Sequence, residues 1–212
     1  AKMEKLFPLS LASRGSAQIG GLLATNAGGV NVLRYGMARD QVLGIEAVMA
    51  DGQIVNGLNR LRKDNTGYDL RHLLIGSEGS LGVITGASLK LVSRPKSKTT
   101  ALLAVMNPAS ALSLLNIARD LFGESLSAFE LISGQSLSFL SETFPKLRQP
   151  WKSPPIWSVL IQFDFFEKKC ANSIFEKLYE HAGEIILDGV TAQSLQDSKD
   201  LWKLRETIPQ AN

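Results

Sequence analysis

The second half of the chain switches between two hydrophobic periods. Apolar residues recur at every second position in some segments, which predicts strands, and at helical spacing in others. The predicted strands are residues 101–105, 126–132, 157–165 and 184–187. The predicted helices are residues 108–122 and 171–182. Asn107 caps the first helix, Pro108 begins it, and Gly123 and Gly183 end the two helices.

The order of these elements is strand–helix–strand twice, which is typical of a ferredoxin-like split unit. Residues 133–155 lie between the two halves and are interpreted as an insertion with one helix and a Pro-rich loop. Residues 193–206 again show helical spacing and predict a further helix.

The first half has shorter elements. Residues 44–50 and 53–56 flank Asp51-Gly52, a pair typical of a tight hairpin turn, and are predicted to be its two strands. The apolar run 72–75 is interpreted as a strand, and helical spacing is confined to 19–24. Alternation in the following segment predicts a strand with one shared face, formed by Val83, Thr85, Ala87, Leu89 and Leu91.

Glycine usage divides the chain near Arg94. Of the 18 glycines, 14 precede this residue and four follow it. Glycine serves where the backbone adopts a positive φ or approaches another group closely, so the first segment is rich in turns. We therefore expect an α+β protein with two domains, residues 1–94 and 95–212.

Composition narrows the class of protein. The 212 residues are 44% hydrophobic, which suits a globular core, and the net charge of +3 comes from well-mixed residues. The basic stretch Arg94–Lys98 lacks interleaved aromatic residues, which favours a solvated linker over a nucleic-acid interface. No apolar run reaches 18 residues, so no membrane span is expected. The single cysteine, Cys170, excludes an internal disulfide, is interpreted as a buried structural thiol, and favours a reducing, cytoplasmic location.

Two glycine-rich clusters, residues 20–29 and 76–85, are the main candidates for chemistry. Paired glycines around Thr25-Asn26 would expose backbone N–H groups to a phosphate, a ribityl chain or a flat ring. Neither cluster matches the P-loop or the dinucleotide fingerprint in its proper context. Each taken alone is also explained as a set of tight turns.

Taken together and in order, these motifs resemble flavoproteins of the vanillyl-alcohol-oxidase type. Within that type the similarity is to the group of D-2-hydroxyglutarate dehydrogenase, D-lactate dehydrogenase and the glycolate oxidase subunit. It covers nearly all of residues 7–95, and the later pattern resembles the cap domain of the same family. The segments that carry it are Phe7-Pro8-Leu9, Gly20-Gly21, Thr25-Asn26-Ala27-Gly28-Gly29, Arg34-Tyr35-Gly36, Asp51-Gly52, Asp64–Leu70, Gly76-Ser77-Glu78-Gly79, Gly82-Val83-Ile84-Thr85 and Leu201–Glu206.

The resemblance implies the second half of a PCMH-type FAD-binding domain followed by a ferredoxin-like cap, or substrate, domain. It implies FAD as cofactor. The residues implied for FAD contact are Gly20, Gly21, Thr25, Asn26, Gly28, Gly29, Gly82, Val83 and Ile84. Arg34 is as readily explained by an ion pair with Asp40 or Glu46, and Glu78 is interpreted as structural.

Arg205 is the residue that the resemblance assigns to substrate. A guanidinium binds a carboxylate at two points, and every 2-hydroxy acid carries a carboxylate. Spacing alone favours a surface ion pair of Arg205 with Glu206 or an aspartate, and the surrounding motif reverses this preference. His72 and His181 lack metal-ligand spacing, so no metal site is expected within the 212 residues. The resemblance implies that the metal-binding and base-supplying motif of the family lies C-terminal to Asn212.

The expected function is that of an internal part of an FAD-dependent dehydrogenase. Such an enzyme oxidises a D-2-hydroxy acid to the 2-oxo acid and passes electrons from the flavin to an acceptor that the sequence does not identify. The alternative, favoured for the isolated polypeptide, is an inactive, non-catalytic folded piece or pseudoenzyme that does not retain FAD. Apolar surface left exposed predicts self-association into a homo-oligomer.

Overall fold

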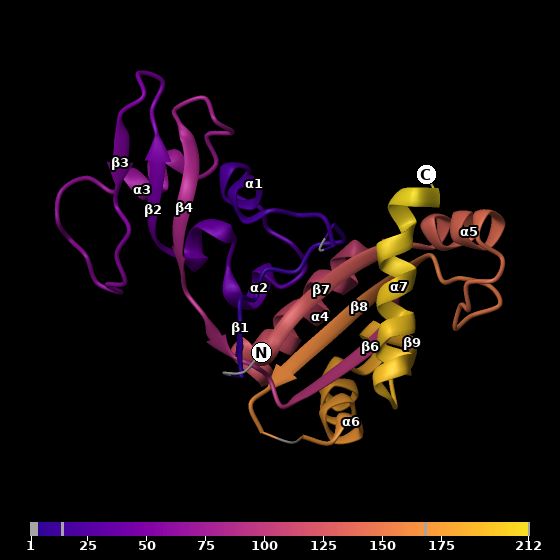
Figure 1. Cartoon of the computed structure of the whole chain (residues 1–212). Helices are drawn as coiled ribbons and strands as arrows, with labels where there is room; N and C mark the ends of the chain where they lie inside the picture. The colour runs from indigo at the N-terminus through magenta and orange to yellow at the C-terminus, as the bar shows by residue number, and fades with distance from the viewer. Residues whose placement is uncertain (1–3, 14, 168, 212) are drawn as a thin grey trace. The chain divides into compact units, whose positions relative to one another are not determined.

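The computed structural model describes residues 4–13, 15–167 and 169–211. Contacts within it divide the chain into two compact units, residues 1–94 (unit 1) and 95–212 (unit 2), which Figure 1 shows in indigo to magenta and in magenta to yellow. Each unit has its own hydrophobic core.

Unit 1 contains a three-stranded antiparallel sheet in the order β3-β2-β4 and a small pair β1-β5. Its strands are β1 (Lys5–Leu6), β2 (Val42–Val48), β3 (Ile54–Asn56), β4 (Val83–Leu89) and β5 (Val92–Ser93). Its helices are α1 (Ile19–Ala24), α2 (Val32–Tyr35), the 3-10 turn η1 (Ala38–Gln41) and α3 (Leu70–Leu74). Its core consists of Leu23, Ala38, Val42, Ile45, Ala47, Leu74 and Ile75.

The predicted shared face of β4 is wrong because the strand contains a bulge. The register with β2 shifts between Glu46 and Ala47, so that Thr85 is skipped. A bulge places two residues opposite one and reverses the alternation. As a result Ile84 packs against the core while Val83 is 63% exposed.

The predicted strand at 72–75 is also wrong, since these residues belong to α3 and its end. A short apolar run does not separate a buried strand from a buried helical turn. Here the Asp69 carboxylate accepts a hydrogen bond from the backbone N–H of His72 at 3.1 Å, which is the bond of a helix cap.

Unit 2 is a four-stranded antiparallel sheet in the order β7-β8-β6-β9. Its strands are β6 (Ser97–Val105), β7 (Leu126–Ser133), β8 (Trp157–Phe165) and β9 (Ile186–Thr191). Its helices are α4 (Pro108–Phe122), α5 (Gly134–Thr143), α6 (Ala171–Ala182), α7 (Leu195–Ala211) and the 3-10 turns η2 (Gly123–Ser125) and η3 (Gly183–Ile185). This strand order, with α4 and α6 as the crossovers, confirms the ferredoxin-like pattern.

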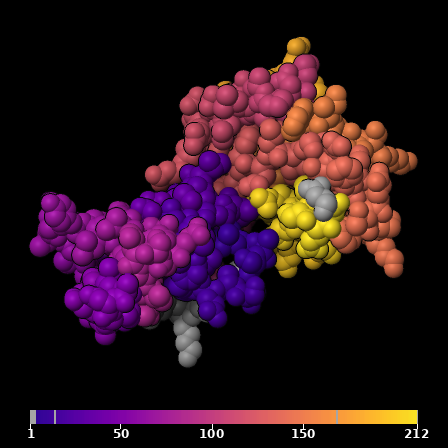
Figure 2. All heavy atoms as spheres, turned by 90° about the horizontal axis from the view of Figure 1, so that it is seen from above, coloured from indigo at the N-terminus to yellow at the C-terminus, as the bar shows by residue number. Residues whose placement is uncertain are grey.

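The two faces of this sheet carry different helices. One core joins β6, β7 and β8 to α4 and α6, and the other joins the opposite face to α5 and α7. Strand alternation explains the division, since Val159, Ile161 and Phe163 point to the first core and Leu160 to the second. In Figure 1 α7 crosses one face of the sheet, and in Figure 2 it lies beside α5.

Two expectations for unit 2 need correction. The last strand begins at Ile186 instead of 184, because residues 183–185 form the turn η3 after α6. Cys170 is exposed and stands at the N-cap of α6, so it is no buried structural thiol. The predicted insertion helix and the helix near the end of the chain are present as α5 and α7.

Candidate functional site

The two glycine clusters of unit 1 meet where α1 packs against β4. Gly20 lies in α1, and a Cβ atom there would stand 3.5 Å from the Ile84 carbonyl oxygen. Gly21 is exposed, and a Cβ atom added to it would have no other atom within 4 Å. The fold therefore brings Gly20, Gly21 and Ile84 together, with the Gly21 backbone on the surface.

The second cluster is joined to the end of α1 by backbone hydrogen bonds. The N–H of Gly76 donates to the Leu23 carbonyl, and that of Glu78 to the Ala24 carbonyl, both at 3.0 Å. Glu78 has a φ of 51°, a conformation unusual for a residue with a side chain. Its role here is structural, through its backbone.

Arg39 holds the turn that follows α1, a role the sequence did not reveal. The guanidinium of Arg39 donates to the carbonyls of His72 and Ile75, each at 2.7 Å. The backbone N–H of Arg39 donates to the Asn26 Oδ1 at 3.0 Å. Asn26 has a φ of 48° and is fixed by this bond. No periodicity or motif marks a lone arginine that binds carbonyls distant in sequence.

Several residues that were predicted to contact the cofactor determine the local path of the backbone. Gly29 has a φ of 84°, and any Cβ would collide with the Ser10 carbonyl oxygen. A Cβ at Gly82 would stand 3.0 Å from the Val48 carbonyl oxygen. The Thr25 hydroxyl donates to the Gly21 carbonyl at 2.9 Å, and Gly28 lies against Val32. Tight approach of another backbone segment explains the glycines at 29 and 82, whereas Gly28 lies against the side chains of Val32 and Met37.

The α1–β4 surface suits part of an FAD molecule. The Gly21 backbone is open, and the apolar side chains of Leu81, just before β4, and Val83, at its start, are exposed. Among the described residues, the buried Ser77 Oγ has no hydrogen-bond partner, which marks an unused polar atom in the neighbouring glycine loop. Open backbone next to apolar surface fits a flat ring with a polar edge. The residues present therefore fit the cofactor.

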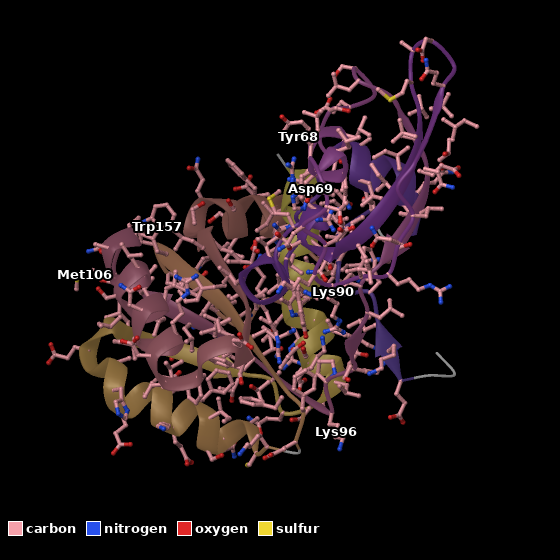
Figure 3. All side chains as sticks on the ribbon, turned by 90° about the vertical axis from the view of Figure 1, so that its left-hand side faces the viewer. Tyr68, Asp69, Lys90, Lys96, Met106 and Trp157 are labelled. Carbon is pink, nitrogen blue, oxygen red and sulfur yellow. The ribbon has the colours of Figure 1, made fainter. Side chains whose placement is uncertain are left out.

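A second polar cluster of unit 1 surrounds Asp69 at the start of α3, next to the exposed Tyr68 (Figure 3). Arg71 donates to the Asp69 carboxylate at 2.7 Å and to the Val42 carbonyl at 2.8 Å. The hydrogen bond from Arg71 lowers the pKa of Asp69, and the backbone bond from His72 adds to this against the effect of burial. The cluster ties α3 to β2, which gives this turn a structural role.

In unit 2, Arg205 projects from α7 toward β7. Its Nε donates to Glu130 Oε2 at 2.8 Å, and both side chains are partly buried. The partner is thus Glu130 on a different element, and the alternative of a surface pair with Glu206 or an aspartate is wrong. Within the described part of the chain, the two Nη atoms of Arg205 have no hydrogen-bond partner.

Gln162 on β8 is the centre of a buried hydrogen-bond network beneath α7. Its Oε1 accepts from Trp202 Nε1 at 2.8 Å and from the Thr100 hydroxyl at 3.4 Å. Its Nε2 donates to Asp164 Oδ1 at 2.9 Å and to the Ser127 hydroxyl at 3.2 Å. All four hydrogen-bonding positions of the amide are used, and Trp202 and Asp164 fix its orientation because one only donates and the other only accepts.

Sequence reasoning missed Glu130, Gln162 and Trp202, although one signal was available. Gln162 and Asp164, together with Ser158, are the polar residues of a mainly apolar strand, and their even spacing places them on one face. Gln162 and Asp164 are almost fully buried, and Lys98 lies 3.3 Å from Asp164. Two polar residues on one face of a buried strand predict a polar partner element, which is α7.

Neither a membrane-spanning helix nor a metal-binding cluster is found among the described residues. No helix in residues 4–13, 15–167 and 169–211 is both long and apolar enough to cross a membrane. In the same residues, no group of three or more His, Cys, Asp or Glu side chains has an arrangement that could hold a metal ion.

The chain thus consists of a glycine-rich α+β unit followed by a ferredoxin-like unit whose sheet makes polar contacts with α7. Two family models match the chain: "FAD binding domain" over residues 1–57 and "FAD linked oxidases, C-terminal domain" over residues 94–212. The second covers more than half of the chain. The chain therefore belongs to the FAD-linked oxidases, whose cofactor is FAD. The mixed helices and sheets of the two units also confirm the expected α+β fold class.

Curated relatives carry dehydrogenase names. D-2-hydroxyglutarate dehydrogenase of Danio rerio is 40% identical over 97% of this chain, and a putative D-lactate dehydrogenase of Schizosaccharomyces pombe is 40% identical over 96%. D-2-hydroxyglutarate–pyruvate transhydrogenase of Saccharomyces cerevisiae is 36% identical over 98%. The chain spans about two fifths of each relative's length, between 39% and 42%.

Solved structures show the same fold at low identity. An alkyldihydroxyacetonephosphate synthase structure superposes with a TM-score of 0.67 at 17% identity, covering 99% of this chain and 39% of that one. At this identity the likeness concerns fold alone.

The expected cytoplasmic location is contradicted. The dehydrogenases of Danio rerio, Arabidopsis thaliana and Rattus norvegicus are named as mitochondrial proteins. The expectation rested on one cysteine, and cysteine content reports redox conditions without distinguishing between compartments that keep thiols reduced.

Proposed function

We propose that this chain is part of an FAD-dependent dehydrogenase that oxidises a D-2-hydroxy acid, such as 2-hydroxyglutarate or lactate, to the 2-oxo acid. Residues 1–94 are the C-terminal part of its FAD-binding domain, and residues 95–212 are the first part of its substrate domain. One observation carries the proposal: both family models match one chain, in order. The names of the relatives support the substrate class.

Unit 1 holds FAD through the surface of α1 and β4. The direct contacts are backbone atoms of Gly20, Gly21 and Ile84, the Thr25 side chain and the exposed Val83. Gly29 and Gly82 act by letting adjoining backbone segments come close, Gly28 by leaving room for the Val32 side chain, and Asn26 by accepting the hydrogen bond of the Arg39 backbone N–H. When bound, FAD supplies the acceptor for the hydride that leaves the C2 carbon of the substrate. The residues of unit 1 bind and orient it.

In unit 2, Arg205 binds the substrate carboxylate. Its Nη atoms can donate two parallel hydrogen bonds to the two carboxylate oxygens, the strongest geometry for this pair. This contact fixes the acid end of the molecule and therefore restricts the position of C2. The substrate is a small molecule, and the reduced flavin passes its electrons to a separate acceptor.

Retention of flavin by the purified chain tests the cofactor part of this proposal. The chain is mixed with excess FAD, freed of unbound cofactor and examined for its visible absorbance. We expect a flavin band near one FAD per chain. Bleaching of that band under anaerobic conditions by D-2-hydroxyglutarate, and not by its L enantiomer, would extend the result to the substrate.

A pair of glycine variants makes the test specific. Gly21→Leu places a side chain on the open surface of α1 without a collision, because no atom lies within 4 Å. We expect it to reduce FAD affinity by about tenfold or more, or roughly 1.4 kcal/mol. Gly15→Leu is the matched control, since Gly15 is equally open but lies outside the proposed surface. Equal FAD affinity of both variants would show that FAD does not bind at the Gly21 surface. No retained flavin at all would favour a folded piece that does not bind FAD.

A further inference from the structure

Arg205 is held along one edge of its guanidinium. The Nε–H donates to Glu130 Oε2 at 2.8 Å, and the contact joins α7 to β7, 75 positions apart in the sequence. Arginine has a planar group whose donors have fixed directions. A single bond to Nε therefore orients the whole plane and leaves the Nη edge for another acceptor.

We propose that Glu130 is a positioning residue, which orients Arg205 for two-point binding of the substrate carboxylate. This inference rests on the proposed function, in which Arg205 contacts the substrate. Glu130 itself is assigned no contact with the substrate. It reduces the number of side-chain conformations that Arg205 must lose when the acid binds.

The negative charge of Glu130 opposes its positioning effect. A carboxylate beside Arg205 repels the incoming carboxylate of the substrate, and the pair is only partly screened because both side chains are partly buried. The hydrogen bond aids binding and the charge weakens it. Glu130→Gln separates the two effects, because glutamine keeps the acceptor oxygen and side-chain length but carries no charge.

The network around Gln162 keeps α7 in place without Glu130. Trp202 donates to Gln162, and the Ser198 hydroxyl lies 2.8 Å from that of Thr100, so two further polar contacts join α7 to the sheet. Leu201 and Leu204 of α7 also lie in the core. Glu130→Ala therefore releases the Arg205 side chain while the helix that carries it stays docked.

The experiment follows the Nε–H signal of Arg205 by NMR in the 15N-labelled chain, with Arg205→Lys to assign it. D-lactate and D-2-hydroxyglutarate are added to the wild-type chain and to each variant. In the wild type we expect an ordered Nε–H signal that shifts in a saturable manner. Glu130→Gln should keep the order and bind the acid as tightly or several-fold more tightly. Glu130→Ala should lose the order and bind about tenfold more weakly.

Lys203→Met is a control for the general electrostatic effect of α7. Lys203 lies on the same helix two positions before Arg205, but it lines a pocket of about 560 Å³ with Thr143, Phe144 and Leu147. Its replacement removes one positive charge from α7 without changing the Arg205–Glu130 pair, and we expect the affinity for either acid to stay within twofold of the wild type.

Different results would overturn the two ideas separately. Acid affinity in Glu130→Ala equal to that of the wild type, or affinity in Glu130→Gln as weak as in Glu130→Ala, would overturn positioning by Glu130 while leaving Arg205 as the carboxylate contact. An Arg205 signal that does not shift with either acid in the folded wild-type chain would overturn the substrate role of Arg205 and the inference with it.

Discussion

At the scale of single residues, this protein surrounds its buried amide Gln162 with a full set of partners. Gln162 uses every donor and acceptor of its amide, and Asp164, 1% exposed, lies next to both Gln162 and Lys98. Each hydrogen bond contributes only about 1 kcal/mol to the free energy of unfolding. A buried donor or acceptor that is left without its partner costs more than that. The stability of α7 on the sheet therefore depends on this network being complete.

Gln162→Leu tests that dependence. Leucine fills a similar volume but leaves Trp202 Nε1 and Asp164 Oδ1 without this partner, so we expect a loss of roughly 2–4 kcal/mol in the free energy of unfolding. Urea denaturation followed by tryptophan fluorescence measures it. Gln196→Leu, at an exposed site on α7, is the control and should change stability by less than about 0.5 kcal/mol. Equal effects of the two changes would show that the network contributes nothing special.

Asp69 predicts a pH dependence for unit 1. Its pKa is lowered from the ordinary value of 3.8, chiefly by the hydrogen bond from Arg71. Folding therefore favours the ionised form, so the stabilisation is fully present above pH 3.8 and disappears as the pH falls through the lowered value. In Asp69→Asn this acid-dependent part should vanish. Urea unfolding of both proteins at about pH 6 and about pH 3, followed by circular dichroism, checks the direction, and an identical loss in both proteins at the lower pH would contradict it.

At the scale of elements, helix ends follow local rules that the sequence displays. Asn107 Oδ1 accepts from the Ser110 N–H at 2.9 Å, Pro108 begins α4, and Gly123, with a φ of 51°, ends it. These are interactions between near neighbours, so they were predictable. The assignment of α3 failed because its five residues are too few for a helical period to appear.

The hydrogen bond that caps α4 predicts how much stability is lost when Asn107 is replaced. Asn107→Ala should lower the free energy of unfolding of unit 2 by about 1 kcal/mol, because the Ser110 N–H loses its acceptor at the helix start. Asn107→Asp keeps an acceptor and should remain within a few tenths of a kcal/mol of the wild type. Urea denaturation of the three proteins compares them, and equal stability of Asn107→Ala and the wild type would count against the cap.

At the scale of the whole molecule, the chain has two units with separate cores. The three tryptophans, Trp151, Trp157 and Trp202, all belong to unit 2, where Figure 3 shows Trp157 near Met106 at one end of the sheet. Tryptophan fluorescence thus reports unit 2, whereas circular dichroism reports both units. Separate cores predict that the units unfold in separate transitions.

FAD provides a way to test this separation. A ligand that binds only the folded form of unit 1 raises the stability of that unit by mass action, about 2.7 kcal/mol at a concentration of about 100 Kd. With saturating FAD, we expect the circular dichroism transition of unit 1 to move to higher urea while the tryptophan transition stays fixed. A tryptophan transition that moves equally would show that the two units unfold together.

Sequence patterns alone predicted a division near Arg94, and they gave the ferredoxin-like order of unit 2, the ends of α4 and the family resemblance. Each of these is recorded in hydrophobic period, glycine content or residues close together in the chain. The sequence also singled out Arg205 and the two glycine clusters.

The groups that these residues contact depend on how distant segments pack together. The bulge in β4 that turns Ile84 inward, the bonds of Arg39 to distant carbonyls and the pairing of Arg205 with Glu130 all join segments far apart in sequence. Such pairings depend on strand register and on the placement of helices over a sheet. A local pattern carries no record of them, because the partner is chosen by packing.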